Sequence, residues 1–420
     1  MPMSSKSVRA LILAVMPMLA IPVAAQADSL SQAFGYNLFI LNDLNQSGTD
    51  TQGKVAVGRN ATISSFSVAS QLPADSATNF VVGGSVSQTG GTVNGSAISG
   101  AGYSFSSASI SGNLYTAGDI IQNQGSVGNV VAGGNYTVSQ AGPQSALVGG
   151  TFTQTSGYIP GNVTVGGDAI LNNPSAGGYY HVNGSVTITG GGSAGGGITY
   201  GTTYSGYSYF NPVQVAPVPV DTSAYTTLPI NFTTVAADLN AASTYWGSLV
   251  ANGSTAISFS QLTLTGTDAN LNIFDLTAAQ LSSISTLAFS VPAGSTALIN
   301  VDGATVNLGP FGYGTITGLD AEHILYNAFD AGTVNMSGIG LEGSLLAPGA
   351  SVNFASGDID GSIIANNLSG QGESHLHLFD GSLPTPPPTA TPFTAVPTPT
   401  SVVGGVMLLS LVVLRRTRYV

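Results

Sequence analysis

A short phrase returns at nearly constant intervals between residues 55 and 188. In its fullest form, a valine is followed after at most one residue by two glycines, a small polar residue and an alternating run. The marker glycines of successive copies are Gly84, Gly118, Gly134, Gly150, Gly167 and Gly184. Their separations are 34, 16, 16, 17 and 17 residues, and 34 is twice 17. A near-fixed period of this size predicts a β-solenoid with one turn of the coil per repeat.

The alternatives to a solenoid are a glycine-rich disordered tract and an ordinary β-sandwich. Runs such as Val163-Thr164-Val165 and Val186-Thr187-Ile188 keep the period of two that belongs to strands, which disorder does not require. We expect the glycines to supply corner backbone angles that a side chain would forbid. The aromatic residues of the repeats are expected inside the coil or at its corners: Tyr103, Phe105, Tyr115, Tyr136, Phe152, Tyr158, Tyr179 and Tyr180.

Charge and cysteine content exclude several classes of protein. The 420 residues include no cysteine, so disulfides, thiolate nucleophiles and cysteine-ligated metals are impossible. Only 6% of residues are charged. Between Asp28 and Thr400 the basic residues are Lys54 and Arg59, against all 19 acidic residues. A body this acidic should repel nucleic acid.

The two ends of the chain have the composition of targeting segments. Residues 1–27 resemble a secretory signal peptide, with Lys6 and Arg9 before an apolar run and Ala25-Gln26-Ala27 as the cleavage site. A spanning helix is the alternative, but the run is short and contains prolines. Residues 383–400 form a Pro/Thr stalk. Residues 401–420 combine an apolar segment with a basic end, which predicts a membrane anchor or sorting signal.

The body between these ends, residues 28–382, is expected to be mostly β, a solenoid with one long helix packed alongside. The repeats occupy 53–204, a helix-containing insertion 205–255, and closing strands 256–382. Apolar residues recur at helical spacing from Phe232 to Leu249, after Asn231 as N-cap. Trp246, the chain's one tryptophan, is expected to pack this helix onto a solenoid face.

Asp43 opens a polar stretch that is predicted to be a loop. Asp43, Asn45, Ser47 and Gly48 match the start of a calcium-binding loop, and Asp50 follows. The twelfth position is Lys54 instead of glutamate, so a simple Asx-type turn is the favoured interpretation.

A second group of candidate ligands lies near the end of the body. Asp358 and Asp360 alternate onto one strand face, with Glu373 close in sequence. His375 and His377 are expected on one face of a strand, as a metal site would require, although no third ligand is identifiable. Calcium is the cofactor that these acids would favour; no other cofactor is predicted.

Three blocks in order resemble the bacterial choice-of-anchor A family. They begin at Tyr36-Asn37-Leu38-Phe39, at Leu262-Thr263-Leu264, and at Tyr326-Asn327-Ala328-Phe329, and together they span about residues 34–381. The resemblance implies a secreted or surface-anchored adhesive or collagen-binding-like module without catalytic residues. The tail resembles a PEP-CTERM sorting signal, with threonine in Val396-Pro397-Thr398-Pro399 where glutamate is usual. That resemblance implies an exosortase-type processing enzyme as a partner.

The leading hypothesis is therefore a non-enzymatic adhesive or extracellular-matrix protein outside the cytoplasm. Its expected partners are polysaccharide, matrix protein or a second copy of itself, and the membrane through the C-terminal segment. An ice-binding or structural coat protein is one alternative, although Thr-x-Thr ladders at every turn are absent from the sequence. A carboxylate-dependent polysaccharide hydrolase is the other, and it requires a cleft that carries two acids such as Asp358 and Asp360.

Overall fold

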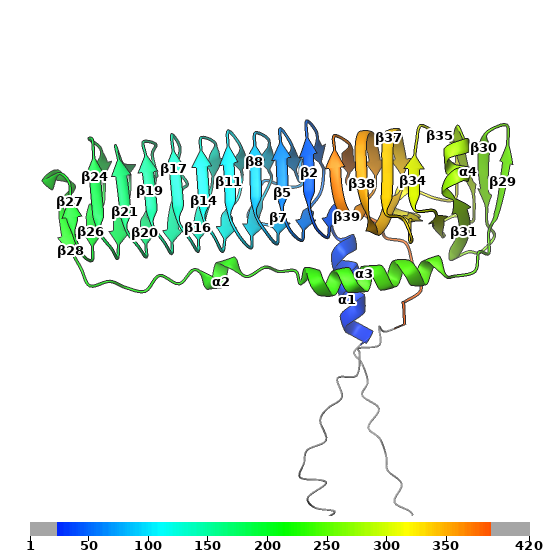
Figure 1. The fold of residues 1–420 in the computed structure, drawn as a ribbon, viewed down its shortest axis with the longest axis horizontal. Helices are drawn as coiled ribbons and strands as arrows, with labels where there is room; N and C mark the ends of the chain where they lie inside the picture. The colour runs from blue at the N-terminus through cyan, green and yellow to red at the C-terminus, as the bar shows by residue number, and fades with distance from the viewer. Residues whose placement is uncertain (1–22, 388–420) are drawn as a thin grey trace, which may run out of the picture. The chain divides into compact units, whose positions relative to one another are not determined.

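Three rows of short parallel strands make up most of the computed structural model, which describes residues 23–387 (Figure 1). A turn of the coil gives one strand to each of two rows and, in most turns, a shorter strand to the third. We name the rows face A, face B and face C. The first turn contains β1 (Leu38–Ile40) on face A, β2 (Leu44–Ser47) on face B and β3 (Asp50–Thr51) on face C. The predicted mostly-β solenoid with one long helix alongside is confirmed.

The first segment of the coil continues through residue 214. Face A continues with β4 (Val55–Val57), β7 (Thr78–Val82), β10 (Ser96–Ser99), β13 (Leu114–Thr116), β16 (Asn129–Ala132), β18 (Ser145–Val148), β20 (Val163–Val165), β23 (Tyr180–Val182), β26 (Ile198–Tyr200) and β28 (Pro212–Gln214). Face B continues with β5 (Ala61–Ser64), β8 (Val86–Thr89), β11 (Tyr103–Ser106), β14 (Ile120–Asn123), β17 (Tyr136–Ser139), β19 (Phe152–Thr155), β21 (Ala169–Asn172), β24 (Val186–Thr189) and β27 (Tyr204–Ser205). Face C continues with β6 (Ser67–Val68), β9 (Thr92–Val93), β12 (Ser109–Ile110), β15 (Ser126–Val127), β22 (Ser175–Ala176) and β25 (Ser193–Ala194).

The second segment builds further turns and a cap. Its coil strands are β31 (Leu271–Thr277), β33 (Thr296–Asp302), β34 (Thr305–Leu308), β36 (Ile324–Asn327), β37 (Thr333–Glu342), β38 (Ser344–Asp360), β39 (Ile363–Gly370) and β40 (Glu373–His375). A separate sheet contains β29 (Ser254–Ser258), β30 (Gln261–Thr265), β32 (Thr286–Ser290) and β35 (Gly312–Thr317). The helices are α1 (Val23–Phe34), α2 (Ser223–Thr226), α3 (Phe232–Gly247) and α4 (Ala278–Ser283), with 3₁₀ turns η1 (Ser208–Phe210) and η2 (Ala321–His323).

The order of turns along the coil differs from the order in the sequence. β1 pairs in parallel with β4 on one side and with β39 on the other. The chain thus starts in the middle of the coil and winds to one end. It returns along the outside through α2 and α3, then winds back until β39 and β40 meet the first turn (Figure 1). The expectation that the solenoid resumes and closes is confirmed, and it closes on its own first strand.

The glycine pairs of the repeat are required because there is no room for a side chain between successive turns. They are not required for a special backbone angle, so the expectation from the sequence is wrong at these positions. A Cβ on Gly149 would lie 2.4 Å from the carbonyl oxygen of Gly133, and one on Gly166 would lie 2.4 Å from that of Gly149. Successive corners therefore stack backbone on backbone. The long interval between Gly84 and Gly118 contains a full turn whose corner residue is Ala101, bonded through its backbone to both.

Positive φ angles occur instead at the corner that follows face B. Ser65, Ser107, Gln124 and Gln140 have φ values of 48°, 52°, 63° and 59°. The left-handed conformation disfavours side chains with a Cβ, so the stacked turns must impose it on these residues. Glycine occupies the equivalent place only in some turns, for example at Gly90, where φ is 66°.

The interior contains buried amides as well as apolar side chains. Gln88 accepts a hydrogen bond at 2.7 Å from the hydroxyl of Tyr103, and Gln154 accepts one at 2.7 Å from Tyr180. A buried polar group needs such a partner. Of the aromatic residues expected inside, Tyr103, Phe105, Tyr136, Phe152 and Tyr180 are buried, whereas Tyr158 and Tyr179 are exposed.

Helix α3 lies on face A, as predicted, and its N-cap is Asn231, which accepts from the backbone N–H of Thr234 at 3.2 Å. Its apolar side packs into one cluster with α1 and the outward residues of face A, and Trp246 is 2% exposed. The indole N–H donates to the carbonyl of Pro384 at 2.8 Å, which holds the end of the body against the helix. The short helix α4 begins with a capping box between Thr277 and Gln280.

The predicted polar loop at residues 42–50 is wrong. β2 and β3 occupy most of this stretch, because β5 and β39 on either side supply ladder partners that override its polar composition. Most of the predicted signal peptide, the stalk beyond residue 387 and the predicted anchor at 401–420 lie outside the described residues. Within residues 23–387 no helix is both long and apolar enough to cross a membrane.

Candidate functional site

Face B presents a regular surface of small neutral polar side chains. Along its strands, residues alternate between the core and the outside, and two positions per strand point outward. From β2 to β24 the outward residues are Asn45, Ser47, Thr62, Ser64, Ser87, Thr89, Ser104, Ser106, Ile121, Asn123, Thr137, Ser139, Thr153, Thr155, Ile170, Asn172, Thr187 and Thr189. Apart from Ile121 and Ile170, each is serine, threonine or asparagine. We call this set the face B array.

The parallel register aligns the face B array into columns. Thr137 is the ladder partner of Ile121 and of Thr153, and Ser139 is the partner of Asn123 and of Thr155. Neighbouring strands lie about 4.8 Å apart, and residues two apart on a strand lie about 6.7 Å apart. Thr-x-Thr pairs occur on β19 and β24, and in every other turn of the array at least one of the two places holds Ser, Asn or Ile. The register between neighbouring strands therefore produces the recurrence of polar side chains. No single stretch of the sequence displays it.

On the second segment, face B becomes an asparagine ladder. Asn335 donates to Asn307 at 2.9 Å, Asn353 donates to Asn335 at 3.0 Å, and Ser369 donates to Asn353 at 3.1 Å. These amides bond to one another along the coil. This half of face B thus has fewer free donors for a ligand than the face B array has.

Asp43 belongs to a ladder of side chains at the corner between faces A and B. Its carboxylate accepts from the backbone N–H of Asn60 at 3.2 Å and from Arg59 at 2.8 Å. Asn60, Asp119, Asn135 and Asp168 each accept, in the same way, the backbone N–H of a residue in the next turn, at 2.7 to 3.1 Å. Where the residue at this corner position is Asp or Asn, it therefore caps the next corner. Asn45 and Ser47, which match the start of a calcium loop in the sequence, point outward from β2.

The remaining candidate residues gather on face C, where the last turn meets the first. Asp358 is the ladder partner of Glu373, and Asp360 is the partner of His375. His375 Nδ1 lies 2.5 Å from Asp360, and its Nε2 lies 3.3 Å from Glu373. Asp50, on β3, interacts with Glu373 from the other side. We call these five residues the seam cluster. The two acids that a hydrolase would need lie along one strand, β38, each with a ladder partner.

Electrostatics in the seam cluster favours bound protons. Partial burial lowers the pKa of His375, but the hydrogen bond and charge of Asp360 and the charges of Glu373 and Asp358 outweigh it, so the pKa is raised. Partial burial and the negative charge of Asp50 raise the pKa of Glu373. Partial burial and the charge of Asp360 likewise raise the pKa of nearby Glu342. Glu342, Glu373 and His375 therefore each bind a proton more tightly than they would in an unfolded chain.

The expected pair of metal-ligating histidines does not form. β40 ends at His375, and the chain then turns, with the backbone N–H of His377 bonded to the carbonyl of His375. His377 faces Glu322 at 3.4 Å, while His375 faces Asp360. Across residues 23–387 no group of three or more histidine, aspartate or glutamate side chains is arranged to hold a metal ion.

The family is decided by the sequence match. The family described as "Putative Ice-binding-like adhesive domain" matches residues 29–113 and 103–376, which is most of the chain. The chain belongs to this family. Membership of the ice-binding-like adhesive family bears out the adhesive type of domain expected from the sequence. No curated protein matches the chain at a significant level.

Two solved structures are similar to this member of the ice-binding-like adhesive family. An ice binding protein from an Antarctic bacterium Flavobacteriaceae has 13% identity and a TM-score of 0.26, over 84% of this chain and 99% of that chain. The tapirin C-terminal domain of Caldicellulosiruptor kristjanssonii has 12% identity and a TM-score of 0.24, over 84% and 98% of the two chains. Neither likeness is close enough to assign a ligand to the adhesive domain described here.

Sequence reasoning did not identify which face of the coil, or which residues, form the face B array. The alternation within each strand was visible, for example in Val186-Thr187-Ile188-Thr189, and it indicated which residues point outward. The signal that could have found the array is an alignment of the repeats on their glycine pairs. That alignment places the residues three and five positions after each second glycine in two polar columns.

Proposed function

We propose that this protein is a non-catalytic adhesive at the cell surface or in the extracellular matrix, and that the face B array is its contact surface. The observation that carries the proposal is the run of outward serine, threonine and asparagine residues across successive turns, without a charged residue. Membership of the ice-binding-like adhesive family supports the same function. Neutral polysaccharide is the partner class that the array fits best, and a matrix protein is the alternative.

The chemistry of the face B array suits a repeating neutral polymer. Hydroxyl and amide groups both donate and accept hydrogen bonds, and so do sugar hydroxyls. Because the strands are fixed by ladders on both sides, little conformational entropy is lost when a ligand binds. Each contact is weak, but many contacts on one rigid surface act together, as in multivalent binding.

Export and surface attachment are part of the proposal. The signal peptide predicted at residues 1–27, the choice-of-anchor A resemblance and the PEP-CTERM-like tail support secretion and retention at the surface, with an exosortase-type enzyme as the processing partner. The described chain ends beside Trp246 and Phe34, on the helix-covered face A. A tether that leaves from face A would keep face B free for contact.

Charged side chains on the face B array test the proposal. The double variant Thr137→Arg with Thr187→Arg places two charges among exposed outward residues of face B. The matched control, Ser126→Arg with Ser193→Arg, places the same charges at exposed positions of face C. Binding of the body to immobilised cell-surface polysaccharide should fall at least tenfold in the first variant and stay within twofold in the control. Equal binding by both variants would exclude face B as the contact surface.

Ice is a second candidate ligand, because Thr153, Thr155, Thr187 and Thr189 form Thr-x-Thr pairs on a flat uncharged face. A surface with this spacing could order water in a regular pattern. Thermal hysteresis, measured in the purified body and in the face B double variant, tests whether ice is a ligand. Absence of hysteresis in the unmodified protein would remove ice from the candidates.

A further inference from the structure

A single outward row of side chains runs along face A and changes character partway. In ladder order it contains Leu346, Ile364, Phe39, Ala56, Val81, Ile98, Tyr115, Val131, Leu147, Thr164, His181 and Thr199. From Leu346 to Ile98 the row is apolar and buried in the cluster beneath α1, α3 and the residues just before α3. From Thr164 onward it is polar and half-buried. The change coincides with the replacement of helix by an extended segment, residues 215–222, which we call the strap.

The strap is attached at separate points and does not pack closely onto face A between them. Asn183 accepts from the backbone N–H of Val218 at 2.9 Å and donates to its carbonyl at 2.5 Å. Beyond the strap, the ring of Tyr225 stacks on that of Tyr115, with centroids 6.3 Å apart and planes 7° from parallel. These contacts fix the chain at Asn183 and at Tyr115, so the segment between them bridges the turns that carry Val131, Leu147 and Thr164.

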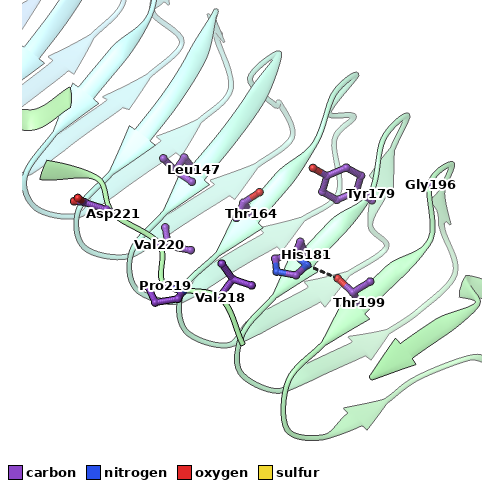
Figure 2. Close-up of a pocket in the computed structure, with 10 residues that line it drawn as sticks. All are labelled: Leu147, Thr164, Tyr179, His181, Gly196, Thr199, Val218, Pro219, Val220 and Asp221. Atoms are coloured by element: carbon purple, nitrogen blue, oxygen red, sulfur yellow. Dashed lines mark hydrogen bonds between the residues drawn. The ribbon is translucent and has the colours of Figure 1, made fainter. Parts of the chain in front are cut away.

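A groove lies between the strap and the strands. One cavity of about 550 Å³ is lined by Leu147, Thr164, Tyr179 and His181 on the strand side, and by strap residues 218–221 opposite (Figure 2). A second cavity of about 390 Å³ shares Leu147, Thr164 and Tyr179 with the first and reaches Tyr115 and Tyr225. The two cavities together form one groove along the coil, with tyrosines at its end and on its side.

The groove carries neutral hydrogen-bonding groups that have no partner among the described residues. His181 uses Nδ1 for a 2.6 Å contact with Thr199, which leaves its Nε2 unpaired. No hydrogen bond is formed by the hydroxyls of Thr164 and Tyr179, and Tyr179 is 41% exposed. Among the lining residues Asp221 is the one carboxylate, and it already accepts from the backbone N–H of Ser223 at 2.9 Å.

We infer that this groove binds a segment of a neutral oligosaccharide chain, an inference that rests on the proposed adhesive function and adds a second site to it. A pyranose ring has an apolar C–H face that packs on an exposed tyrosine ring, and hydroxyls that pair with imidazole and hydroxyl groups. An anionic sugar would need lysine or arginine side chains, and neither residue type lines the groove. Its volume and its mixture of apolar walls with a few polar groups are those of a ligand site.

Titration calorimetry on the full secreted body tests the inference. The probes are cellohexaose and maltohexaose as neutral chains, hexagalacturonate as an anionic chain, and a synthetic peptide of residues 383–400 as a proline-rich competitor. We expect saturable binding of at least one neutral hexasaccharide and none of hexagalacturonate. Tyr179→Ala should weaken binding at least tenfold. Tyr207→Ala, which removes another exposed tyrosine (47% exposed) outside the groove, should change it less than twofold.

Several results would overturn the inference: failure of both neutral hexasaccharides to bind, unchanged affinity in Tyr179→Ala, or binding of the peptide in their place. If Tyr179→Ala folds poorly, the affinity of His181→Ala for the hexasaccharides tests the same groove. Failure here is distinguishable from failure of the proposed function. Surface adhesion lost through the face B double variant but kept in Tyr179→Ala would leave the proposed function intact without this site. Oligosaccharide binding without any surface adhesion would support this site and contradict the proposed function.

Discussion

The side-chain amide of Asn37 donates a hydrogen bond to the backbone carbonyl of Gly361, at a nitrogen–oxygen distance of 3.2 Å. The same amide reaches the carbonyl of His375, and Asn37 is fully buried. It therefore joins the strand that starts the coil to the turn that finishes it. The first and last parts of the chain depend on each other for their edge partners, so we expect the whole coil to unfold as one unit.

Replacement of Asn37 should loosen this junction. Asn37→Ala removes three hydrogen bonds, to the carbonyls of Gly361 and His375 and to the hydroxyl of Ser374, and we expect the free energy of unfolding to fall by about 2 kcal/mol. Urea denaturation measures the loss, and hydrogen exchange should show it first in β1 and β39. Asn45→Ala, at an exposed position of β2, is the control and should stay within about 0.5 kcal/mol. Equal effects of the two changes would mean that the amide of Asn37 contributes nothing to closure.

A methyl group at the stacked glycine corners should be poorly tolerated. In Gly149→Ala the new Cβ would meet the carbonyl oxygen of Gly133 at 2.4 Å, so neighbouring turns must move apart. We expect the free energy of unfolding to fall by about 1–3 kcal/mol, and a lower thermal midpoint measures the loss. Gly191→Ala is the matched control, because nothing lies within 4 Å of its Cβ and its φ is not positive. A similar loss in the control would show that the close approach of Gly149 to Gly133 is not the cause.

Attachment of α3 depends on a buried amide network as well as on apolar contact. Asn327 donates to the carbonyl of Ser243 at 2.9 Å and to Asn300 at 3.0 Å, and it accepts from the Ser243 hydroxyl at 2.6 Å. Asn327→Ala should cost about 2–3 kcal/mol, because partners in the helix and in β33 lose their bonds together. Fluorescence of Trp246, which lies on the same helix, reports the detachment.

Asn240→Ala is the control for this network. Asn240 is exposed on α3 and bonds only within the helix, to the carbonyl of Ala236 at 2.8 Å. Since alanine has the higher helix propensity, stability should be unchanged or slightly greater. If Asn327→Ala behaves like Asn240→Ala, apolar packing alone holds the helix.

The seam cluster should make the protein more stable in mild acid than at pH 8. Glu373 and Glu342 have pKa values above the ordinary 4.5, and His375 has one above 6.5. In each case the folded state binds the proton more tightly than the unfolded state does. The associated stability is present below the ordinary pKa and is lost as the pH rises through the folded pKa. Thermal midpoints between pH 5 and pH 8 measure the slope.

Glu373→Gln should flatten that slope and raise stability at pH 8, because it removes repulsion with Asp50. The gain should be below about 1 kcal/mol, since solvent screens these partly exposed groups. Asp168→Asn is the control: the amide oxygen can still accept from the backbone N–H of Ser185, and the pH dependence should not change. A steeper slope in Glu373→Gln would contradict the raised pKa of Glu373 as a source of the pH dependence.

Local pattern predicted much of this fold from particular residues. The spacing from Gly134 to Gly150 and Gly167 gave the length of a turn, because one turn of the coil has a fixed perimeter. The stretch from Asn231 to Trp246 gave α3 with its cap, because capping and amphipathic spacing are local properties. The residue pairs of the seam cluster were not predictable as contacts, although Asp358, Asp360, Glu373 and His375 were singled out individually. The partner Asp50 lies on β3, far away in the sequence.

Sequence by itself determined the period, the alternation of core and surface, the helix and the near absence of charge in this ice-binding-like adhesive domain. Tertiary structure alone decided which turns are neighbours, since parallel pairing joins residues that no local pattern connects. It made β39 the partner of β1, turned the polar stretch from Asp43 into strands, and aligned Thr137 with Thr153 in one column. The physical reason is that a solenoid strand takes its hydrogen-bond partners from adjacent turns, so the surface that can meet a ligand exists only once the turns are stacked.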